Sequence, residues 1–285
     1  MSTGEITILL NSTHKDPTNS NRFIYNFPTT VKFGKGDCVS LSAISIYNSF
    51  FNVQSSRANN TFSVMWNANT SIQHNFTIPD GSYSIPQLNY FLQYSCVQNN
   101  LYVTNSNGDF VYFLELVINA SRYGAEVRAY ALPTSATATT LGYTKPTAAT
   151  WSFPGSAQTP QLIIPTTAMG SLIGHIAGTY PSSISASTQV NFSTVTPQIA
   201  TVNALVMTLK LINSNYSIPP SLFESLPLKT SFGSILTFEN RNNTKNRISE
   251  GTYSNIVIDF YDQLFNKLPI IDNEVTITLS LSIVA

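Results

Sequence analysis

The feature that most constrains the fold is an alternation of apolar and hydroxyl side chains near the end of the chain. In a β-strand, successive side chains point to opposite faces of the sheet, so this pattern predicts one buried face and one polar face. A strand of this kind is typical of an antiparallel sheet that covers a core on one side only. The apolar positions are Val275, Ile277, Leu279, Leu281 and Ile283, and Thr276, Thr278, Ser280 and Ser282 lie between them.

Further strands are predicted along the rest of the chain, because short runs rich in β-branched and aromatic residues recur between turn-forming residues. About four fall on either side of a loop-rich middle, which is the number needed for an eight-stranded jelly roll. No repeat of fixed period occurs, which argues against a propeller or a solenoid. We therefore predict an all-β fold, a single jelly roll in the form of a double-sheet β-sandwich. The predicted strands are 5–10, 23–27, 37–47, 61–66, 72–78, 101–104, 110–118, 126–132, 202–212, 232–238, 253–261 and 275–284.

One short helix is predicted after the turn at residues 79–81. Ser84 and Gln87 have the spacing of a capping box, and Pro86 lies in the first turn, where its missing N–H costs little. Apolar residues then recur at steps of three and four, which gives the helix one buried stripe. This stripe consists of Ile85, Leu88, Leu92 and Cys96.

The middle of the chain loses its periodicity. Residues 133–160 are rich in alanine, threonine and proline, and they form a stretch longer than an ordinary loop. We interpret this region as a loop-rich surface insertion at about 133–200 and expect residues 133–160 to be dispensable. The whole chain, residues 1–285, is then expected to form one jelly-roll domain.

Charge is scarce in this sequence. It has 14 basic and 14 acidic side chains, a formal net charge of zero, and only 10% charged residues, against about 25% in typical soluble domains. With no excess of basic residues we expect no nucleic-acid partner and no attraction to an anionic membrane. A neutral surface rich in Asn, Ser and Thr favours close contact with other subunits. We also expect no signal peptide and no membrane span, because no apolar stretch approaches the required ~18 residues.

Histidines and cysteines give no pattern of a metal or nucleophile site. His14, His74 and His175 occur in three separate segments without a metal-binding spacing. Cys38 and Cys96 are predicted to pack as small apolar residues, and a nucleophilic pair with a histidine is the alternative. We accordingly predict no catalytic residue, no cofactor and no metal ion.

The remaining polar groups also favour structural roles. Asp259 and Asp262, with Glu239 and Glu250 nearby, could suggest a pair of catalytic carboxylates or a Ca²⁺ site. No D-x-D-x-D-G array accompanies them, so we expect these carboxylates to form hydrogen bonds at strand ends instead. Two further groups could suggest phosphate binding and genome binding, respectively. We interpret the first as glycines that allow close packing or turns, and the second as a solvated loop between strands. The two groups are Gly170, Gly174 and Gly178, and Arg241, Lys245 and Arg247.

Several segments, taken in order, resemble the jelly-roll capsid proteins of virophages and Polinton-like viruses. The resemblance spans nearly the whole chain, and the order of the motifs is its most specific property. The matching segments are 21–27 with 39–52, the predicted helix at 83–89, residues 172–181, and residues 232–236 and 251–256 with the closing strand. The family's major capsid protein is a double jelly roll of roughly twice this length. The resemblance therefore points to the minor capsid protein, which forms the pentons.

This resemblance implies a structural protein without enzymatic activity. It implies a homopentamer at the icosahedral five-fold vertices, a double jelly-roll major capsid protein as partner, and a place in the virion after assembly inside the infected host cell. Two alternatives stay open, because a fold does not determine a function. One is a carbohydrate- or receptor-binding jelly roll, in which Trp151 and Tyr143 would stack on sugar rings. The other is a cupin-like metalloenzyme, whose His/Glu cluster the sequence lacks.

Overall fold

The computed structural model describes residues 3–66, 72–240 and 244–284. The chain divides into two compact units. We call residues 1–50 with 202–285 the terminal unit, and residues 51–201 the inserted unit. This division differs from the expected single domain with an insertion at about 133–200, because the interrupting segment begins at Phe51 and has a core of its own.

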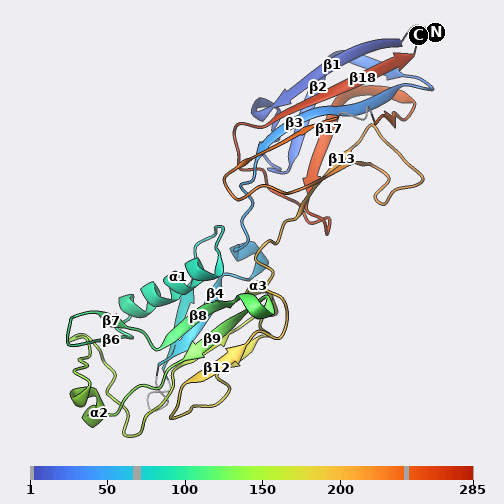
Figure 1. The fold of residues 1–285 in the computed structure, drawn as a ribbon. Coiled ribbons are helices and arrows are strands. Elements are labelled where there is room, and N and C mark those ends of the chain that lie inside the picture. The colour runs from blue at the N-terminus through green and yellow to red at the C-terminus, as the bar shows by residue number, and fades with distance from the viewer. Residues whose placement is uncertain (1–2, 67–71, 241–243, 285) are drawn as a thin grey trace. The chain divides into compact units, whose positions relative to one another are not determined.

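Two antiparallel sheets form the terminal unit, and N-terminal strands in blue lie beside C-terminal strands in red (Figure 1). The first sheet has the order β1-β18-β3-β15, with the short β16 also paired to β3, and the second has the order β14-β13-β17-β2. The strands of the first sheet are β1 (Thr3–Asn11), β18 (Thr276–Val284), β3 (Cys38–Tyr47), β15 (Ile235–Glu239) and β16 (Asn246–Arg247). Those of the second are β14 (Leu222–Pro227), β13 (Ala204–Leu209), β17 (Gly251–Tyr261) and β2 (Arg22–Phe33).

The pairing of these strands is nested. The first strand of the unit pairs with the last, β1 with β18, and the next pairs inward are β2 with β17, β3 with β15, and β13 with β14. This is the connectivity of a jelly roll, so the predicted fold class is confirmed. The inserted unit interrupts the connection between β3 and β13.

The alternation of β18 determines which face is buried. Ile277, Leu279 and Leu281 are buried and are paired in register with Ile44, Leu41 and Val39 of β3. Together with apolar residues of the second sheet they form the core of the terminal unit. The hydroxyl residues of β18 occupy the opposite face, as the period-two pattern predicts.

The allocation of strands differs from the prediction in one respect. Three strands of the jelly roll precede the inserted unit and five follow it. This count leaves out β16, which is a two-residue strand paired with β3. The strands predicted between 61 and 132 belong to the inserted unit instead, and β14 was not predicted. The sequence pattern of β14 is weak, because the strand contains Glu224 and ends at Pro227. Its pairing with β13 is also irregular.

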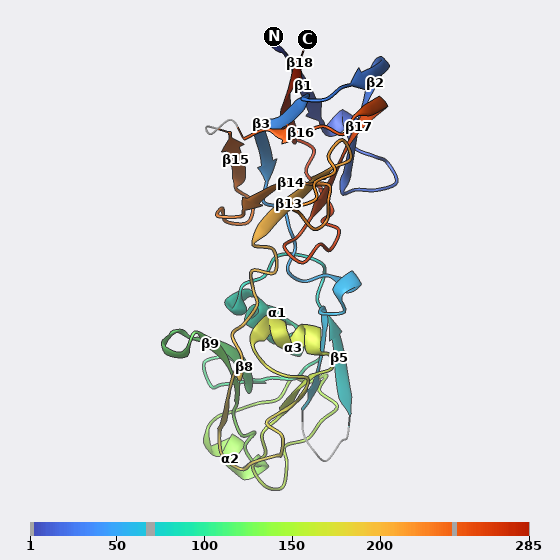
Figure 2. The ribbon, with the colours of Figure 1, turned by 90° about the vertical axis from the view of Figure 1, so that its right-hand side faces the viewer.

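The inserted unit combines small sheets with three α-helices (Figures 1 and 2). One sheet has the order β11-β10-β4-β5, a second the order β12-β9-β8, and β6 pairs with β7. The strands are β4 (Thr61–Met65), β5 (Gln73–Thr77), β6 (Val103–Thr104), β7 (Phe110–Val111), β8 (Leu114–Asn119), β9 (Gly124–Ala129), β10 (Gln161–Ile164), β11 (Gly178–Tyr180) and β12 (Gln189–Phe192). The helices are α1 (Ile85–Gln98), α2 (Ser135–Thr140) and α3 (Thr167–Ile173), and short 3-10 turns occur at Ser12–His14, Ser55–Arg57 and Ala120–Arg122.

Helix α1 is the predicted helix, with the predicted cap. The Ser84 backbone N–H donates to Oε1 of Gln87 over 2.7 Å, and the Gln87 N–H donates back to Oγ of Ser84 over 3.4 Å. The stripe from Ile85 to Cys96 is buried against the inserted unit's core. Helices α2 and α3 were not predicted, because each is too short to show a 3.6-residue period. Each begins at a threonine cap, Thr134 and Thr166 respectively.

Residues 133–160 are not the peripheral excursion that the sequence suggested. Trp151 is only 4% exposed, and its ring packs on Trp66 with the centroids 5.4 Å apart. Its indole Nε1–H donates to the backbone oxygen of Asn100 over 2.6 Å. Ala138 of α2 is buried as well. This stretch therefore contributes side chains to the core of the inserted unit.

Candidate functional site

The outer face of the β1-β18-β3-β15 sheet is a regular surface of small hydroxyl side chains. Ser280 is in register with Thr7 on one side and Ser40 on the other, and Thr276 is in register with Ser45. The neighbouring positions in each strand point into the core, so these side chains point outward. We call this surface the hydroxyl face; its members are Thr7, Thr276, Thr278, Ser280, Ser282, Ser40, Ser45 and Thr237, of which Ser40 and Ser282 are buried.

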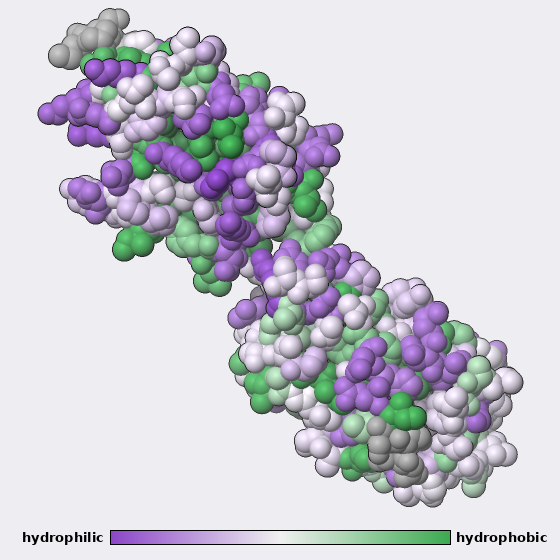
Figure 3. All heavy atoms as spheres, turned by 180° about the vertical axis from the view of Figure 1, so that it is seen from behind, coloured by the Kyte–Doolittle hydropathy of each residue, from purple (hydrophilic) through white to green (hydrophobic). Residues whose placement is uncertain are grey.

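Apolar and charged groups lie at the margins of the hydroxyl face. Leu9 of β1 points outward beside Thr278 and is 54% exposed. At another margin Lys245 Nζ donates to Oγ of Ser282 over 2.8 Å and lies 3.5 Å from a carboxylate oxygen of Glu5. Figure 3 shows hydrophobic residues in small groups between hydrophilic ones on the visible surface. The face can therefore offer both donors and acceptors without burying a charge.

An ion pair between Arg22 and Asp259 lies on the outward side of the second sheet, where several side chains are buried. Nε and Nη2 of Arg22 donate to the two carboxylate oxygens of Asp259 over 2.6 and 3.1 Å, and this bond raises the pKa of Arg22. Val206 and Thr208, which share the outward parity on β13, are buried as well. Asp259 thus holds two adjacent strands together through a two-point carboxylate–guanidinium bond.

Asp262 is equally committed to local structure. Its carboxylate accepts hydrogen bonds from the backbone N–H groups of Leu264 and Asn266 over 2.8 and 3.0 Å, and from the Asn266 amide over 3.0 Å. Asp262 therefore stabilises the turn after β17, in agreement with the hydrogen bonding at a strand end that the sequence predicted. Within the described part of the chain, no group of three or more His, Cys, Asp or Glu side chains could hold a metal ion.

The histidines and cysteines lie in separate environments. His14 Nδ1 is 3.1 Å from the side-chain oxygen of Asn11, and burial lowers the pKa of His74 on β5. Cys96 is buried in the stripe of α1, and burial raises the pKa of its thiol to about 12, so it stays protonated and is a poor nucleophile. The Cys38 Sγ lies 3.3 Å from the carbonyl oxygen of Gly36. Both cysteines are free; Cys96 packs as the sequence predicted, whereas Cys38 is only partly buried.

Glycine allows a close approach at the end of α3. A Cβ placed on Gly170 would lie 2.4 Å from the carbonyl oxygen of His175, which a real side chain could not tolerate. Gly174 ends the helix with a positive φ of 78°, the left-handed conformation that glycine adopts at low cost. The predicted packing and turn roles are thus confirmed for Gly170 and Gly174, whereas a Cβ on Gly178 would meet only ordinary contacts.

The basic cluster is only partly described. Arg241 lies outside the described residues, and Arg247 belongs to β16, opposite Cys38. Lys245 contacts the hydroxyl face as given above. The two described cations of the cluster therefore lie at the edge of the first sheet.

His175 is a buried imidazole without a hydrogen-bond partner for either ring nitrogen among the described residues. It is 1% exposed, and its ring lies 4.8 Å from that of Tyr180. Burial lowers its pKa from 6.5 to about 4. Between these two pH values the unfolded chain binds a proton that the folded chain excludes, so stability falls as the pH falls.

We therefore expect the inserted unit to lose about 3 kcal/mol of stability from this group alone as the pH falls from 7 to below 4. The measurement is chemical denaturation between pH 7 and 4, followed by tryptophan fluorescence, since Trp66 and Trp151 both report on this unit. His175→Phe, which cannot be protonated, is expected to flatten the pH dependence. An equally steep pH dependence in this variant would assign the acid sensitivity to other groups.

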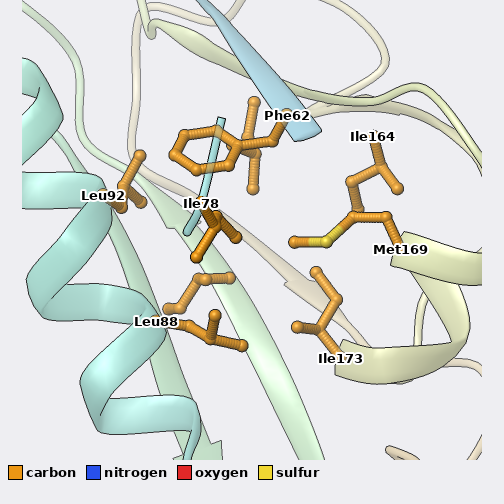
Figure 4. A pocket seen from close by; sticks show the side chains of 9 residues that line it. Phe62, Ile78, Leu88, Leu92, Ile164, Met169 and Ile173 are labelled. Carbon is orange, nitrogen blue, oxygen red and sulfur yellow. The ribbon is translucent and has the colours of Figure 1, made fainter. Parts of the chain in front are cut away.

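Two hollows of the inserted unit differ in character. One lies between α1, α3 and the strands β4, β8 and β10. Its wall consists only of apolar side chains such as Leu88, Leu92 and Met169 (Figure 4). It has a volume of about 10 Å³, which is space for roughly one water molecule. It is therefore a packing void. The other is an open hollow of about 820 Å³ with several aromatic side chains in its wall, of which only Tyr143 was singled out from the sequence.

The nested pairing of its eight strands places the terminal unit in the class of single jelly rolls. The sequence matches no family model and no curated protein. Among solved structures, the chain is similar to the mavirus penton protein, with a TM-score of 0.45, 10% identity and coverage of 99% of both chains. It is also similar to a chain of the Sputnik virophage structure, with a TM-score of 0.38, 10% identity and coverage of 99% of this chain and 97% of that one.

Proposed function

We propose that this chain is a structural capsid protein, without catalytic activity, whose jelly roll forms part of a virus shell. The observation that carries this proposal is the hydroxyl face. A sheet holds its side chains on a rigid, regular surface, and each hydroxyl can both donate and accept a hydrogen bond. A second subunit can therefore bind this face without the desolvation cost of burying charges. The scarcity of charge in the sequence and its ordered capsid-like motifs support the same function.

The particular assembly that we propose is a homopentamer at the five-fold vertices of the virion, in contact with a double jelly-roll major capsid protein. A closed ring of five requires a heterologous contact, in which one surface of a subunit meets a different surface of the next. We assign the hydroxyl face to one side of this contact. Assembly then takes place inside the infected host cell, and the finished protein resides in the capsid. Among the described residues no helix has the length and apolar character needed to cross a membrane.

The experiment is co-expression with the double jelly-roll major capsid protein, followed by nuclease treatment and a salt series. We expect shells with occupied vertices to persist at 1 M salt, because screening shortens the Debye length to ~3 Å and weakens only charged contacts. The pentamer released from the shells should have a mass five times 31.2 kDa by light scattering. Ser280→Arg, which places a charge at the centre of the hydroxyl face, should leave the vertices empty.

The matched control is Thr147→Arg, which adds the same charge at an exposed position of the inserted unit. Both variants should melt within about 1 °C of the wild type, since surface substitutions rarely change stability by more than about 0.5 kcal/mol. Occupied vertices in Ser280→Arg would exclude the hydroxyl face from the contact. Shells that lose their vertices on nuclease treatment or with rising salt would contradict a neutral interface and direct attention to Lys245 and Arg247.

A further inference from the structure

The open hollow of the inserted unit has the composition of a ligand site rather than of a gap between loops. Its volume of about 820 Å³ is in the range that small-molecule sites have. Five aromatic side chains contribute to the wall, and hydroxyl and carboxylate groups lie among them. The aromatic residues are Phe110, Tyr112, Phe113, Tyr130 and Tyr143, and the polar ones are Glu115, Thr137, Ser187 and Thr188.

The aromatic wall is held in place before any ligand arrives. Phe110 is 49% exposed, yet its ring rests on that of Tyr102 with the centroids 4.6 Å apart. Tyr143 is fixed through its backbone N–H, which donates to the Ala138 oxygen of α2 over 2.8 Å. A half-exposed aromatic ring supported from behind is a platform on which a flat apolar surface can stack.

Separate segments that form the hollow are joined by hydrogen bonds. The Thr104 and Thr144 backbones bond to each other over 2.8 and 2.9 Å, and their hydroxyls are 2.6 Å apart, which links β6 to the segment after α2. The segment at 185–188 is attached through the Thr159 N–H, which donates to the Ser185 oxygen over 2.9 Å. Figure 1 shows β6, β7 and α2 together at one end of this unit. The hollow is therefore largely preformed, which lowers the entropic cost of binding.

Glu115 supplies the one charge among the residues that line the hollow. Its Oε2 accepts a hydrogen bond from the Tyr130 hydroxyl over 2.8 Å, and a carboxylate has further lone pairs that can accept from a ligand. Burial and this bond raise the pKa of Tyr130, so the phenol stays a donor. Among the described residues, no lysine or arginine lines the hollow, and Arg128, which interacts with Tyr130, is paired with Glu126. This disfavours phosphate, sulfate and sialic acid as ligand groups.

We infer that this hollow binds a neutral oligosaccharide. The C–H face of a pyranose ring is apolar and can stack on Phe110 or Tyr143, while adjacent hydroxyls of the same ring can donate to Glu115 and exchange hydrogen bonds with the serine and threonine rim. A proline-rich peptide also fits aromatic grooves, but it presents carbonyl acceptors and few N–H donors. A carboxylate cannot pair with such acceptors, so the sugar matches this wall better.

The test is binding of the purified full-length protein to an array of neutral, sialylated and sulfated glycans, with each hit confirmed by titration of the free oligosaccharide. We expect hits among the neutral glycans. Phe110→Ala removes the stacking platform and should weaken binding about tenfold. Glu115→Gln keeps the size of the side chain but removes its charge, and should also weaken binding about tenfold.

Phe192→Ala is the matched control. Phe192 is an aromatic residue of the same unit with a similar exposure of 43%, and it does not line the hollow. This variant should bind as the wild type does, and all three variants should keep the wild-type melting temperature. Absence of binding to any neutral glycan at millimolar concentration would overturn the inference. So would a preference for acidic glycans or proline-rich peptides, or unchanged affinity in both Phe110→Ala and Glu115→Gln.

Discussion

Leu279→Asp is expected to prevent the terminal unit from folding. Leu279 is completely buried and lies in register with Leu41 of β3 and Ile8 of β1, at the centre of the first sheet. A carboxylate here would have no partner, and burying it costs several kcal/mol. This is comparable to the whole stability of a domain, about 5–15 kcal/mol. We expect insoluble protein, or soluble protein whose thermal melting lacks the transition of the terminal unit.

Thr278→Asp is the control at the neighbouring position. Thr278 belongs to the hydroxyl face, so its new carboxylate would reach water and should change the stability of the unassembled protein by no more than about 1 kcal/mol. The measurement is thermal unfolding by circular dichroism under identical conditions. Equal melting temperatures for both variants would mean that β18 does not have the register described above.

Local structure could be predicted in both units where it depends on neighbouring residues. The alternation at 275–284 identified β18, and the predicted strand at 253–261 matches most of β17. The helix at 85–98 carried its own start signal in Ser84 and Gln87. In each case the side chains that define the element lie within a few residues of one another, so the pattern is visible in the sequence.

The two units could not be separated in this way. The jelly roll pairs strands far apart in the chain, and the inserted unit uses the same alternating strands. Nothing local marks the change between Phe50 and Phe51 or between Thr201 and Val202. A single domain was therefore expected, because the composition does not change at either boundary.

Long-range contacts also explain what the sequence missed in the candidate sites. The hydroxyl residues of β18 were visible as a polar face, but their neighbours on β1 and β3 follow only from the pairing. Asp259 was interpreted together with Asp262 as a carboxylate that forms hydrogen bonds at a strand end, whereas its ion-pair partner Arg22 is 237 residues away. The aromatic wall of the hollow likewise gathers Phe110, Tyr130 and Tyr143 from three separate segments.

The stretch at 133–160 is the clearest case of a misleading composition. Its alanines, threonines and prolines are typical of a surface loop, and a loop of this kind could be shortened at little cost, because closure entropy changes slowly with length. The structure places Trp151 in the core between Trp66 and Phe153, with centroid distances of 5.4 Å to both. A single large aromatic residue can anchor an otherwise irregular segment, and no periodicity reveals it.

Trp151→Ala is accordingly expected to destabilise the inserted unit by about 3–5 kcal/mol, the usual cost of removing a large buried aromatic ring and leaving a cavity. The same change leaves the Asn100 backbone oxygen without its indole donor, which adds to the loss. Thr150→Ala, at the exposed neighbouring position, should change the stability by less than about 0.5 kcal/mol. Chemical denaturation followed by tryptophan fluorescence, which comes from Trp66 alone in Trp151→Ala, measures both variants. A cost below about 1 kcal/mol for Trp151→Ala would return 133–160 to the role of a dispensable excursion, whereas a large cost that is absent from Thr150→Ala would establish that the inserted unit needs this stretch to form its core.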